Sequence, residues 1–465
     1  MKALLVNPFQ VDLVQKKGRI YTRRWTPLDL ANTAAILERD GVDVSIVDAN
    51  AEHLPPEQVA LRARGFDKAF ITSTSLDRWQ CPHLNLDPFL QAVSAVRPVV
   101  PEVYVMGSHG TVKPKEVLAS SQADAVIRGE PEQTVLDLCR ASSLAEVKGI
   151  THMVNGEAVD NPAQPPVKMD EIPRPAFHLL PMHRYHYEVL GKNFSLFEMS
   201  RGCASDCTFC LLKPYGVGVR KKSVENLIAD VEHAILNFGV RTAYFIDLEF
   251  TVLRKQVVEF CSYLERKSYD FTWCCQTRFD LVDDDLLALM KRAGCRLIHF
   301  GVEAGSEEVL RKVDKGITMT AIEAGMKKVK AAGIESACFF IMGFPGARKK
   351  DMDDIARFAR KLNPTYPLFH VAAPYPGTKM YEEALKGSSH PFSDDTLFPE
   401  AYRGAFSVEE LKKMTRSAYL RFYTSPNYLW SRLSKGEFRA LGNQLGLFWQ
   451  FVRTERPATP TISPR

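Results

Sequence analysis

Three cysteines carry the strongest chemical signal in the chain. Cys203, Cys207 and Cys210 have the spacing C-x3-C-x2-C and follow a strand-like run at 194–198. Cysteine thiolates hold iron–sulfur clusters, one thiolate on each iron. Three thiolates on a [4Fe–4S] cluster leave one iron free, and chemistry on a small ligand requires such an open metal position. The spacing therefore predicts a cluster that binds and activates a ligand.

Other uses of these cysteines fit the sequence less well. A zinc site usually has four ligands in two pairs, and no second C-x2-C or H-x3-H lies nearby. A disulfide framework is disfavoured because nothing indicates export and intracellular thiols stay reduced. The remaining cysteines are scattered, and we expect them to be buried, reduced core residues: Cys81, Cys139, Cys261, Cys274, Cys275, Cys295 and Cys338.

Apolar runs alternate with helix-period segments over residues 1–150. The runs are 2–8, 43–49, 67–74, 102–107 and 124–128. A helix is expected from Leu28 to Asp40, with Gly41 as its stop. This alternation predicts an α/β, doubly wound parallel sheet, whose ligands bind beyond the carboxyl ends of the strands. Small polar loops lie at those ends, at 72–75, 107–110 and 128–132, although Gly107 and Gly129 could equally serve only as turns.

A proline-rich stretch separates this region from a second one. Residues 151–190 are predicted to be a linker, since its prolines exclude a regular helix or central strand. Over 191–380 the alternation restarts and gives six βα units, which predict an incomplete TIM-like barrel with its active site at the strand carboxyl ends. The expected strands are 195–199, 242–247, 271–277, 296–302, 336–342 and 368–372.

The C-terminal region, 381–465, is predicted to be helical, with helices over 408–421, 428–435 and 438–452 and a disordered tail after Arg456. Its aromatics interleave with arginines. Such helices could close the barrel, cap a pocket for a large or apolar substrate, or lie on a membrane surface. The net charge of +5 does not argue for nucleic acid. No signal peptide or run of 18 apolar residues is found, so we expect a cytoplasmic protein.

The cysteine spacing, with Phe209 before the last cysteine, resembles the signature of the radical S-adenosylmethionine (SAM) superfamily. The resemblance implies that the open iron chelates the amino and carboxylate groups of SAM. One electron from the cluster then cleaves SAM to methionine and a 5′-deoxyadenosyl radical. The strand-end residues expected to contact SAM are Phe209, Asp247, Glu249, Arg278, Glu303 and Gly343.

Each of these residue types suits one part of SAM. Carboxylates accept from the ammonium or the ribose hydroxyls, and Arg278 pairs with the carboxylate. The turn at Gly343 lets the backbone approach the adenine. Within the family class the second strand usually ends in D-D-x-F-T, whereas Leu248 replaces the second Asp here. Structural salt bridges at the barrel mouth are the alternative role for the carboxylates.

The N-terminal region resembles the cobalamin-binding-like domain that precedes the radical SAM domain in one large class. There the last two loops read G-G-x-H-A and R-G-E-x-E, and here they read G-S-H-G and R-G-E-P-E. The resemblance implies a bound cobalamin. The chain lacks D-x-H-x-x-G, the motif that supplies a lower axial histidine, as many members of the class do; some members do not use cobalamin. The expected contacts are Ser73, Thr74, Ser108, His109, Gly129 and Glu130.

The resemblance implies a cobalamin-dependent radical SAM enzyme that methylates an unactivated carbon of a natural-product, lipid or tetrapyrrole-like small molecule. Methylcobalamin would donate the methyl group, a second SAM would restore it, and a flavodoxin or ferredoxin would supply electrons. Oxidative cyclisation, rearrangement or coupling is the alternative within the same class. A tRNA methylthiotransferase would carry further N-terminal cluster cysteines. A redox sensor would fill all four irons.

Overall fold

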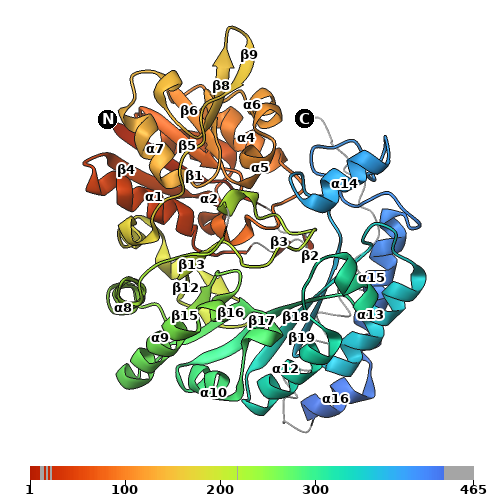
Figure 1. Ribbon diagram of the computed structural model, residues 1–465. Coiled ribbons are helices and arrows are strands. Elements are labelled where there is room, and N and C mark those ends of the chain that lie inside the picture. The colour runs from red at the N-terminus through yellow and green to blue at the C-terminus, as the bar shows by residue number, and fades with distance from the viewer. Residues whose placement is uncertain (11–14, 17–18, 21–22, 217, 434–465) are drawn as a thin grey trace.

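The computed structural model describes residues 1–10, 15–16, 19–20, 23–216 and 218–433 (Figure 1). The predicted helix over 438–452 and the predicted tail after Arg456 lie outside the described residues. Two sheets dominate the described part: one of seven strands in the N-terminal region and one of six strands in the central region. Small two-stranded pairings lie between them, formed by β2 (Gln15–Lys16) with β3 (Arg19–Ile20) and by β10 (His186–Tyr187) with β11 (Gly191–Lys192).

The N-terminal sheet has the order β4-β1-β5-β6-β7-β8-β9. Its first five strands are parallel, as the alternation of strands and helices predicts. From β1 the chain adds β4 on one side of β1 and then β5 on the other side. The carboxyl ends of β1 and β5 therefore form the topological switch point, where open α/β sheets bind ligands. The strands are β1 (Lys2–Asn7), β4 (Asp43–Asp48), β5 (Lys68–Thr72), β6 (Glu102–Met106), β7 (Ala125–Ile127), β8 (Ile150–Val154) and β9 (Glu157–Asp160).

The sheet continues past residue 150, where the sequence analysis predicts a linker. β8 and β9 form an antiparallel hairpin on its edge. The turn is Asn155-Gly156, and both residues have positive φ, at 51° and 87°. Asn-Gly is the strongest short-range hairpin signal because a type I′ turn needs left-handed backbone at both positions. The neighbouring prolines obscured this signal.

Helices cover both faces of the N-terminal sheet. α1 (Leu28–Arg39) and α7 (Pro131–Arg140) pack on one face, and α3 (Pro56–Ala63), α4 (Asp87–Val96) and α6 (Pro114–Ser121) on the other. Successive side chains of β1 enter the two cores in turn, Leu5 on one side and Leu4 on the other. The short helices α2 (Ala49–Glu52) and α5 (Ser108–Val112) follow strand ends.

The central sheet is an incomplete barrel, with the parallel order β12-β15-β16-β17-β18-β19 and an open side between β12 and β19. Its strands are β12 (Phe194–Phe197), β15 (Thr242–Phe245), β16 (Thr272–Thr277), β17 (Cys295–Glu303), β18 (Glu335–Met342) and β19 (Tyr366–Val371). The connecting helices are α8 (Val224–Phe238), α9 (Arg254–Lys267), α10 (Asp284–Arg292), α11 (Glu307–Lys312), α12 (Met319–Ala331) and α13 (Lys349–Leu362).

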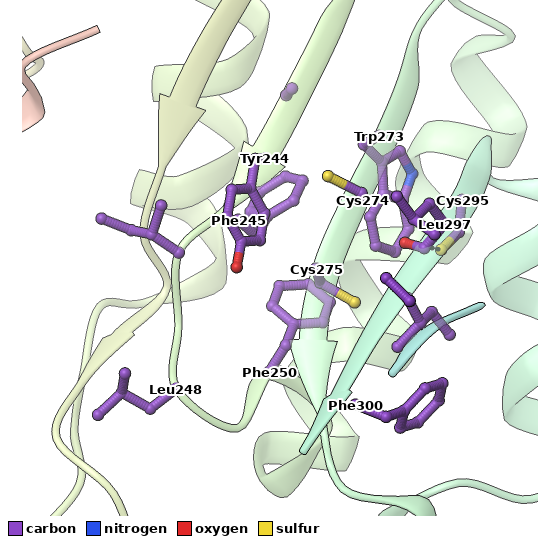
Figure 2. Close-up of a cluster of buried hydrophobic side chains, with 14 of the residues drawn as sticks. Tyr244, Phe245, Leu248, Phe250, Trp273, Cys274, Cys275, Cys295, Leu297 and Phe300 are labelled. Carbon is purple, nitrogen blue, oxygen red and sulfur yellow. Dashed lines mark hydrogen bonds between the residues drawn. The ribbon is translucent and has the colours of Figure 1, made fainter. Parts of the chain in front are cut away.

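Local chemistry sets where these helices begin and end. Ser223 and Ser306 accept hydrogen bonds from backbone N–H groups in the first turns of α8 and α11, as N-cap serines commonly do. Gly239 ends α8 in the left-handed conformation. On the outer face of the sheet Phe245, Phe250 and Trp273 form an aromatic cluster, in which Phe245 stands edge-on to Trp273 (Figure 2). One hydrophobic core extends from this sheet to residues of the N-terminal region such as Leu28 and Trp79.

Helices α14 (Lys379–Gly387), α15 (Val408–Tyr423) and α16 (Pro426–Leu433) follow the barrel. α15 packs against β19, where Tyr419 stands edge-on to Phe369. Within the described ranges, no helix combines the length and apolarity that a membrane crossing needs. Of the cysteines expected in the core, five are buried, but Cys81 is exposed and Cys139, near the end of α7, is half-buried.

Candidate functional site

The three predicted cluster cysteines lie on one loop at the carboxyl end of β12. β13 (Ser200–Arg201) pairs antiparallel with β14 (Arg220–Lys221) and closes the base of this loop. Cys203, Cys207 and Cys210 are all reduced and half-buried. Backbone bonds at Thr208 hold the loop from both sides, with its N–H on the carbonyl of Val313 (3.1 Å) and its carbonyl on the N–H of Met380 (2.9 Å).

This donor set fits a cluster better than a single ion. Among the described residues, no three His, Cys, Asp or Glu side chains converge closely enough to hold one metal ion. A [4Fe–4S] cluster needs thiolates spread over different irons, each cysteine on its own metal. Burial raises the pKa of the Cys203 thiol to about 11, so metal binding would release protons from the loop.

Two of the predicted SAM contacts join directly to the cysteine loop. Ser205 donates to Glu249 (2.7 Å), and Arg278 donates to Ser205 (3.1 Å). Arg278 also forms a forked pair with Asp280 and donates to the carbonyls of Lys315 and Gly316. The strand ends β15 and β16 are thereby fastened to the loop that carries the cysteines.

A buried ion pair lies beside the same loop. Glu303 ends β17 with a φ of +65° and accepts from Lys315 at 2.8 Å. Lys315 is 9% exposed, and its ammonium is close enough to Cys207 to favour the thiolate of that cysteine. A cation and a carboxylate that are held next to the cysteines are complementary to the two charged groups of an amino acid.

The remaining predicted SAM residues divide into two groups. Phe209 packs against Phe344, with ring centroids 5.3 Å apart. Phe344 directly follows Gly343, whose φ is +83°. Asp247 is instead 1% exposed and accepts from the N–H of Met199 (3.0 Å) and the hydroxyl of Ser200 (2.5 Å). Burial raises the pKa of Asp247 to about 7. Its visible role is to fix the segment that enters the cysteine loop.

Arg201, at the start of this loop, joins the two sheets. Its guanidinium is 1% exposed and makes a forked pair with Glu198 (2.8 Å to each oxygen) and a pair with Glu132 (2.6 Å). Glu130 lies 3.5 Å away and pairs bidentately with Arg220. Glu130, Glu132, Glu198, Arg201 and Arg220 are called the junction cluster below, since two come from the N-terminal region and three flank the cysteine loop.

The carboxylates of the junction cluster differ in electrostatics. Burial would raise the pKa of Glu198, but the charge and hydrogen bonds of Arg201 outweigh it, and the pKa is lowered. Burial dominates at Glu132, whose pKa is raised and whose second oxygen has no hydrogen-bond partner. Glu130 was predicted as a cobalamin contact. The structure shows that it accepts from Arg220 and from the N–H of Val167, and a contact with cobalamin stays a prediction.

Other predicted cobalamin contacts lie together at the ends of β5 and β6, where they bond to one another. His109 Nδ1 faces the Ser73 hydroxyl (2.9 Å), and Nε2 faces the carbonyl of His83 (2.7 Å). A carbonyl only accepts, so Nε2 carries the hydrogen. Thr74 accepts from the N–H of Ser108 (2.9 Å). Gly129 has a φ of +79° and donates its N–H to Thr111.

A pocket opens beside these loops at the switch point between β1 and β5. Its lining combines three amide side chains, one hydroxyl, two arginines, an aspartate, a histidine, a proline and an indole. The Trp25 Nε1–H is buried without a hydrogen-bond partner. Corrins carry amide side chains around their rim, and amides pair well with amides. The residues around this pocket are Asn7, Pro8, Gln10, Arg23, Trp25, Asn50, Ser75, Asp77, Arg78 and His83.

The sequence analysis missed several of these residues. Lys315 stands in a short loop between helices and has no motif around it. Trp25 lies on an irregular segment and Asn50 lies in the short helix α2, so only the tertiary fold brings them together. The junction cluster had one readable signal, since R-G-E-P-E and R-G-C place charges beside turn-forming glycines that lead into buried elements.

Comparison with known proteins places this geometry in a family. The radical SAM superfamily model matches residues 197–359. An uncharacterised methyltransferase of Pyrococcus horikoshii is 30% identical over 442 residues, which are 92% of this chain and 94% of that protein. The anaerobic magnesium-protoporphyrin IX monomethyl ester cyclase of Rubrivivax gelatinosus is 26% identical over 460 residues, 94% of this chain and 80% of its own.

A solved structure shares the two-sheet fold. TsrM, a radical S-adenosylmethionine methyltransferase from Kitasatospora setae, was solved with cobalamin and a [4Fe–4S] cluster bound. It superposes with a TM-score of 0.68 at 17% identity and covers 89% of this chain and 84% of its own. The C-x3-C-x2-C loop lies at the carboxyl end of an incomplete barrel, and the Pyrococcus relative is similar over nearly the whole chain. The chain therefore belongs to the radical SAM superfamily of enzymes.

Proposed function

We propose that this protein is a cobalamin-dependent radical SAM enzyme that methylates an unactivated carbon of a small molecule. The observation that carries the proposal is the junction cluster. It ties the cysteine loop to the strand-end loops of the N-terminal sheet, the edge at which such sheets bind ligands. A corrinoid held by that sheet and a cluster held by the loop would then serve one substrate. The Pyrococcus relative, named a methyltransferase, is similar across both sheets.

The residues present suit the cofactors. Cys203, Cys207 and Cys210 would hold the cluster, and Glu249, Arg278, Glu303 and Lys315 offer charges opposite to those of the SAM ammonium and carboxylate. Asn7, Gln10 and Asn50 offer amide groups to a corrin rim. When bound, these groups supply a carbon radical and a transferable methyl group. The chain contributes binding, orientation and exclusion of water.

Asp247 and Arg201 act on position rather than on the substrate. Asp247 holds the backbone N–H of Met199, which fixes where the loop leaves β12. Arg201 fixes the same loop against the N-terminal sheet. We place the protein in the cytoplasm, because a cluster that reduces SAM needs reduced thiols and an electron donor such as flavodoxin or ferredoxin.

Anaerobic purification from cells grown with cobalamin, followed by iron and corrinoid analysis, tests the proposal. We expect four irons and one corrinoid per chain, and formation of 5′-deoxyadenosine or methylated product with SAM and a reductant. The variant Cys210→Ser should lose iron. Cys139→Ser is the matched control, since Cys139 is half-buried but lies outside the loop. Iron without corrinoid, even after methylcobalamin is added, would contradict methyl transfer.

Oxidative cyclisation is the second candidate. The Rubrivivax relative is named a cyclase and is similar over 94% of this chain, so this likeness also spans both sheets. Incubation with methyl-labelled SAM separates the two. Label in the product indicates methyl transfer, whereas an oxidised, unlabelled product with 5′-deoxyadenosine indicates cyclisation or rearrangement.

A further inference from the structure

Five neighbouring strands of the barrel each contribute one uncharged polar or aromatic side chain to its inner face. They are Tyr244 of β15, Gln276 of β16, His299 of β17, Phe339 of β18 and His370 of β19, called the ring belt below. Tyr244 donates to Gln276 (2.9 Å) and stacks on His299 with centroids 5.1 Å apart. His299 lies 5.8 Å from Phe339, and Phe339 stacks on His370 at 5.7 Å.

The neighbours of these residues along the strands show which face the ring belt occupies. Phe245 packs edge-on against Phe260 of α9, and Phe369 packs against Tyr419 of α15, so both face the outer helices. Side chains alternate between the two faces of a strand. Tyr244 and His370, one position away from them, therefore face inward.

Part of the ring belt is accessible to solvent, whereas the outer face of the same strands is buried. His370 is exposed, and Phe339 and Gln276 are half-buried. In contrast, Phe340 is 0% and Phe369 is 4% exposed. Tyr244 and His299 are 7% and 5% exposed, and Tyr187 contacts the His299 ring. The available ring surfaces are therefore those of Phe339 and His370, and flat aromatic and imidazole faces favour stacking with another flat ring.

The ring belt has no permanently charged side chain, and the pocket between β1 and β5 that adjoins it is lined by two arginines and one carboxylate. Burial, then the charge of Arg23, lowers the pKa of His299 to about 3, so this imidazole is uncharged at neutral pH. Arg23 lies over the Trp25 indole, 4.2 Å from the ring centroid, and Arg78 lines the same pocket. Asp77, 3.6 Å from Arg23, offsets one of these two positive charges. The remaining positive charge opposes the entry of a positively charged ligand at the Trp25 end.

One end of the ring belt meets the switch-point pocket at Trp25. The indole stands edge-on to Tyr244 with centroids 5.4 Å apart and also lines that pocket. Trp25 is 6% exposed, and its N–H has no hydrogen-bond partner. A buried donor without an acceptor is costly, and an acceptor on a ligand would relieve that cost.

We propose that the ring belt binds the substrate, and that the substrate is a planar, unsaturated molecule without positive charge whose acceptor group takes the Trp25 N–H. The assignment rests on the proposed function, because a substrate there lies between the barrel strands and the pocket assigned to the corrinoid. It narrows the substrate class to conjugated or aromatic ring systems. Saturated ring skeletons and cationic compounds are excluded.

Binding of three matched probes to the cluster-loaded, corrinoid-loaded protein tests this, without turnover. The probes are naphthalene-2-carboxamide, its saturated decahydro analogue and the planar cation 2-naphthyltrimethylammonium. Equilibrium dialysis gives each Kd. We expect the planar amide to bind about tenfold more tightly than the saturated amide, with the cation weakest. Equal binding of the planar and saturated amides, or tightest binding of the cation, would overturn the proposal.

Adjacent phenylalanines of β18 supply a matched pair of variants. Phe339→Leu removes a ring from the inner face, and Phe340→Leu removes one from the outer face. Phe339→Leu should weaken binding of the planar amide by about fivefold, whereas Phe340→Leu should leave its Kd unchanged. His370→Leu, also on the inner face, should weaken binding as well. Unchanged affinity in both inner-face variants would refute the site. Because iron, corrinoid and SAM cleavage are measured separately, failure here is distinguishable from failure of the proposed function.

Discussion

The junction cluster and the ring belt differ in the chemistry of their side chains, since one is made of charged groups and the other of uncharged polar and aromatic groups. In the junction cluster, Arg201 and its carboxylates are buried charges that pair with one another at 2.6–2.8 Å, although the second oxygen of Glu132 has no hydrogen-bond partner. In the ring belt, neutral side chains touch at ring distances of 5.1–5.8 Å. Forked ion pairs accept only one geometry, whereas stacked rings tolerate sliding. The protein therefore fixes its cysteine loop rigidly and leaves its proposed substrate surface adaptable.

Arg201→Met should have the largest effect, because it removes the central cation of the junction cluster. Removing the guanidinium leaves Glu132 and Glu198 buried without their cation, and we expect a loss of about 3–5 kcal/mol in the free energy of unfolding. Chemical denaturation measures it, with iron content as a second readout. Lys361→Met, which removes an exposed pair with Glu323, is the control and should cost less than about 1 kcal/mol. Equal losses in the two variants would show that the junction cluster carries no special weight.

Gly202→Ala tests the loop next to Arg201. A Cβ at Gly202 would lie 1.9 Å from the carbonyl oxygen of Gly218, and the backbone φ is +92°. Strain and collision together should cost about 2–4 kcal/mol and reduce cluster retention. Gly41→Ala separates the two causes, because Gly41 has a φ of +78° with nothing within 4 Å. A loss no greater than that of Gly41→Ala would mean that the loop can shift.

Lowering the pH probes the neutrality of the ring belt. The folded pKa of His299, about 3, lies below its ordinary value of about 6.5, so the unfolded chain binds more protons between these values. Stability contributed by the neutral imidazole is present above pH 6.5 and is lost as the pH falls. From pH 7 to pH 5, His299→Gln should lose roughly 2 kcal/mol less than the parent protein. Parallel pH profiles of unfolding would contradict the assignment.

The smallest expected change in unfolding free energy distinguishes the outer face of β18 from its inner face. Phe340→Leu should cost about 1 kcal/mol of unfolding free energy, because its ring is fully buried in the outer core. Phe339→Leu should cost less, since half-buried surface contributes less on folding. Thermal unfolding of the two variants side by side measures the difference. A larger loss at Phe339 would mean that the inner face is core and not a binding surface.

Periodicity and the cysteine spacing were sufficient to predict both sheets, the incomplete barrel and the loop that bears the cysteines. These features depend on local pattern, and every predicted strand of the barrel appears within a few residues of its expected bounds. The hairpin at Asn155-Gly156 was missed because nearby prolines outweighed a two-residue signal. The SAM and cobalamin contacts stay predictions, and the structure shows what each residue bonds to.

The junction cluster and the ring belt could not be predicted from sequence for different reasons. Arg201 and Glu132 are 69 residues apart, and only the packing of two sheets brings them together. The members of the ring belt lie on strands separated by whole helices, and each alone looks like an ordinary inward-facing strand residue. Trp25 was unremarked because an indole in an irregular segment carries no signal of an unmet hydrogen bond.

The pairing of β13 with β14 has a consequence for how the enzyme matures. Arg201 and Arg220, which face each other across this pairing at the two ends of the cysteine loop, both reach Glu130. Glu130 belongs to the part of the chain that the ribosome releases first, and N-terminal regions fold first during synthesis. The anchor is thus in place before the loop emerges. Both ends of the cysteine loop would then be held at Glu130 as soon as Arg220 is synthesised, before a cluster is bound.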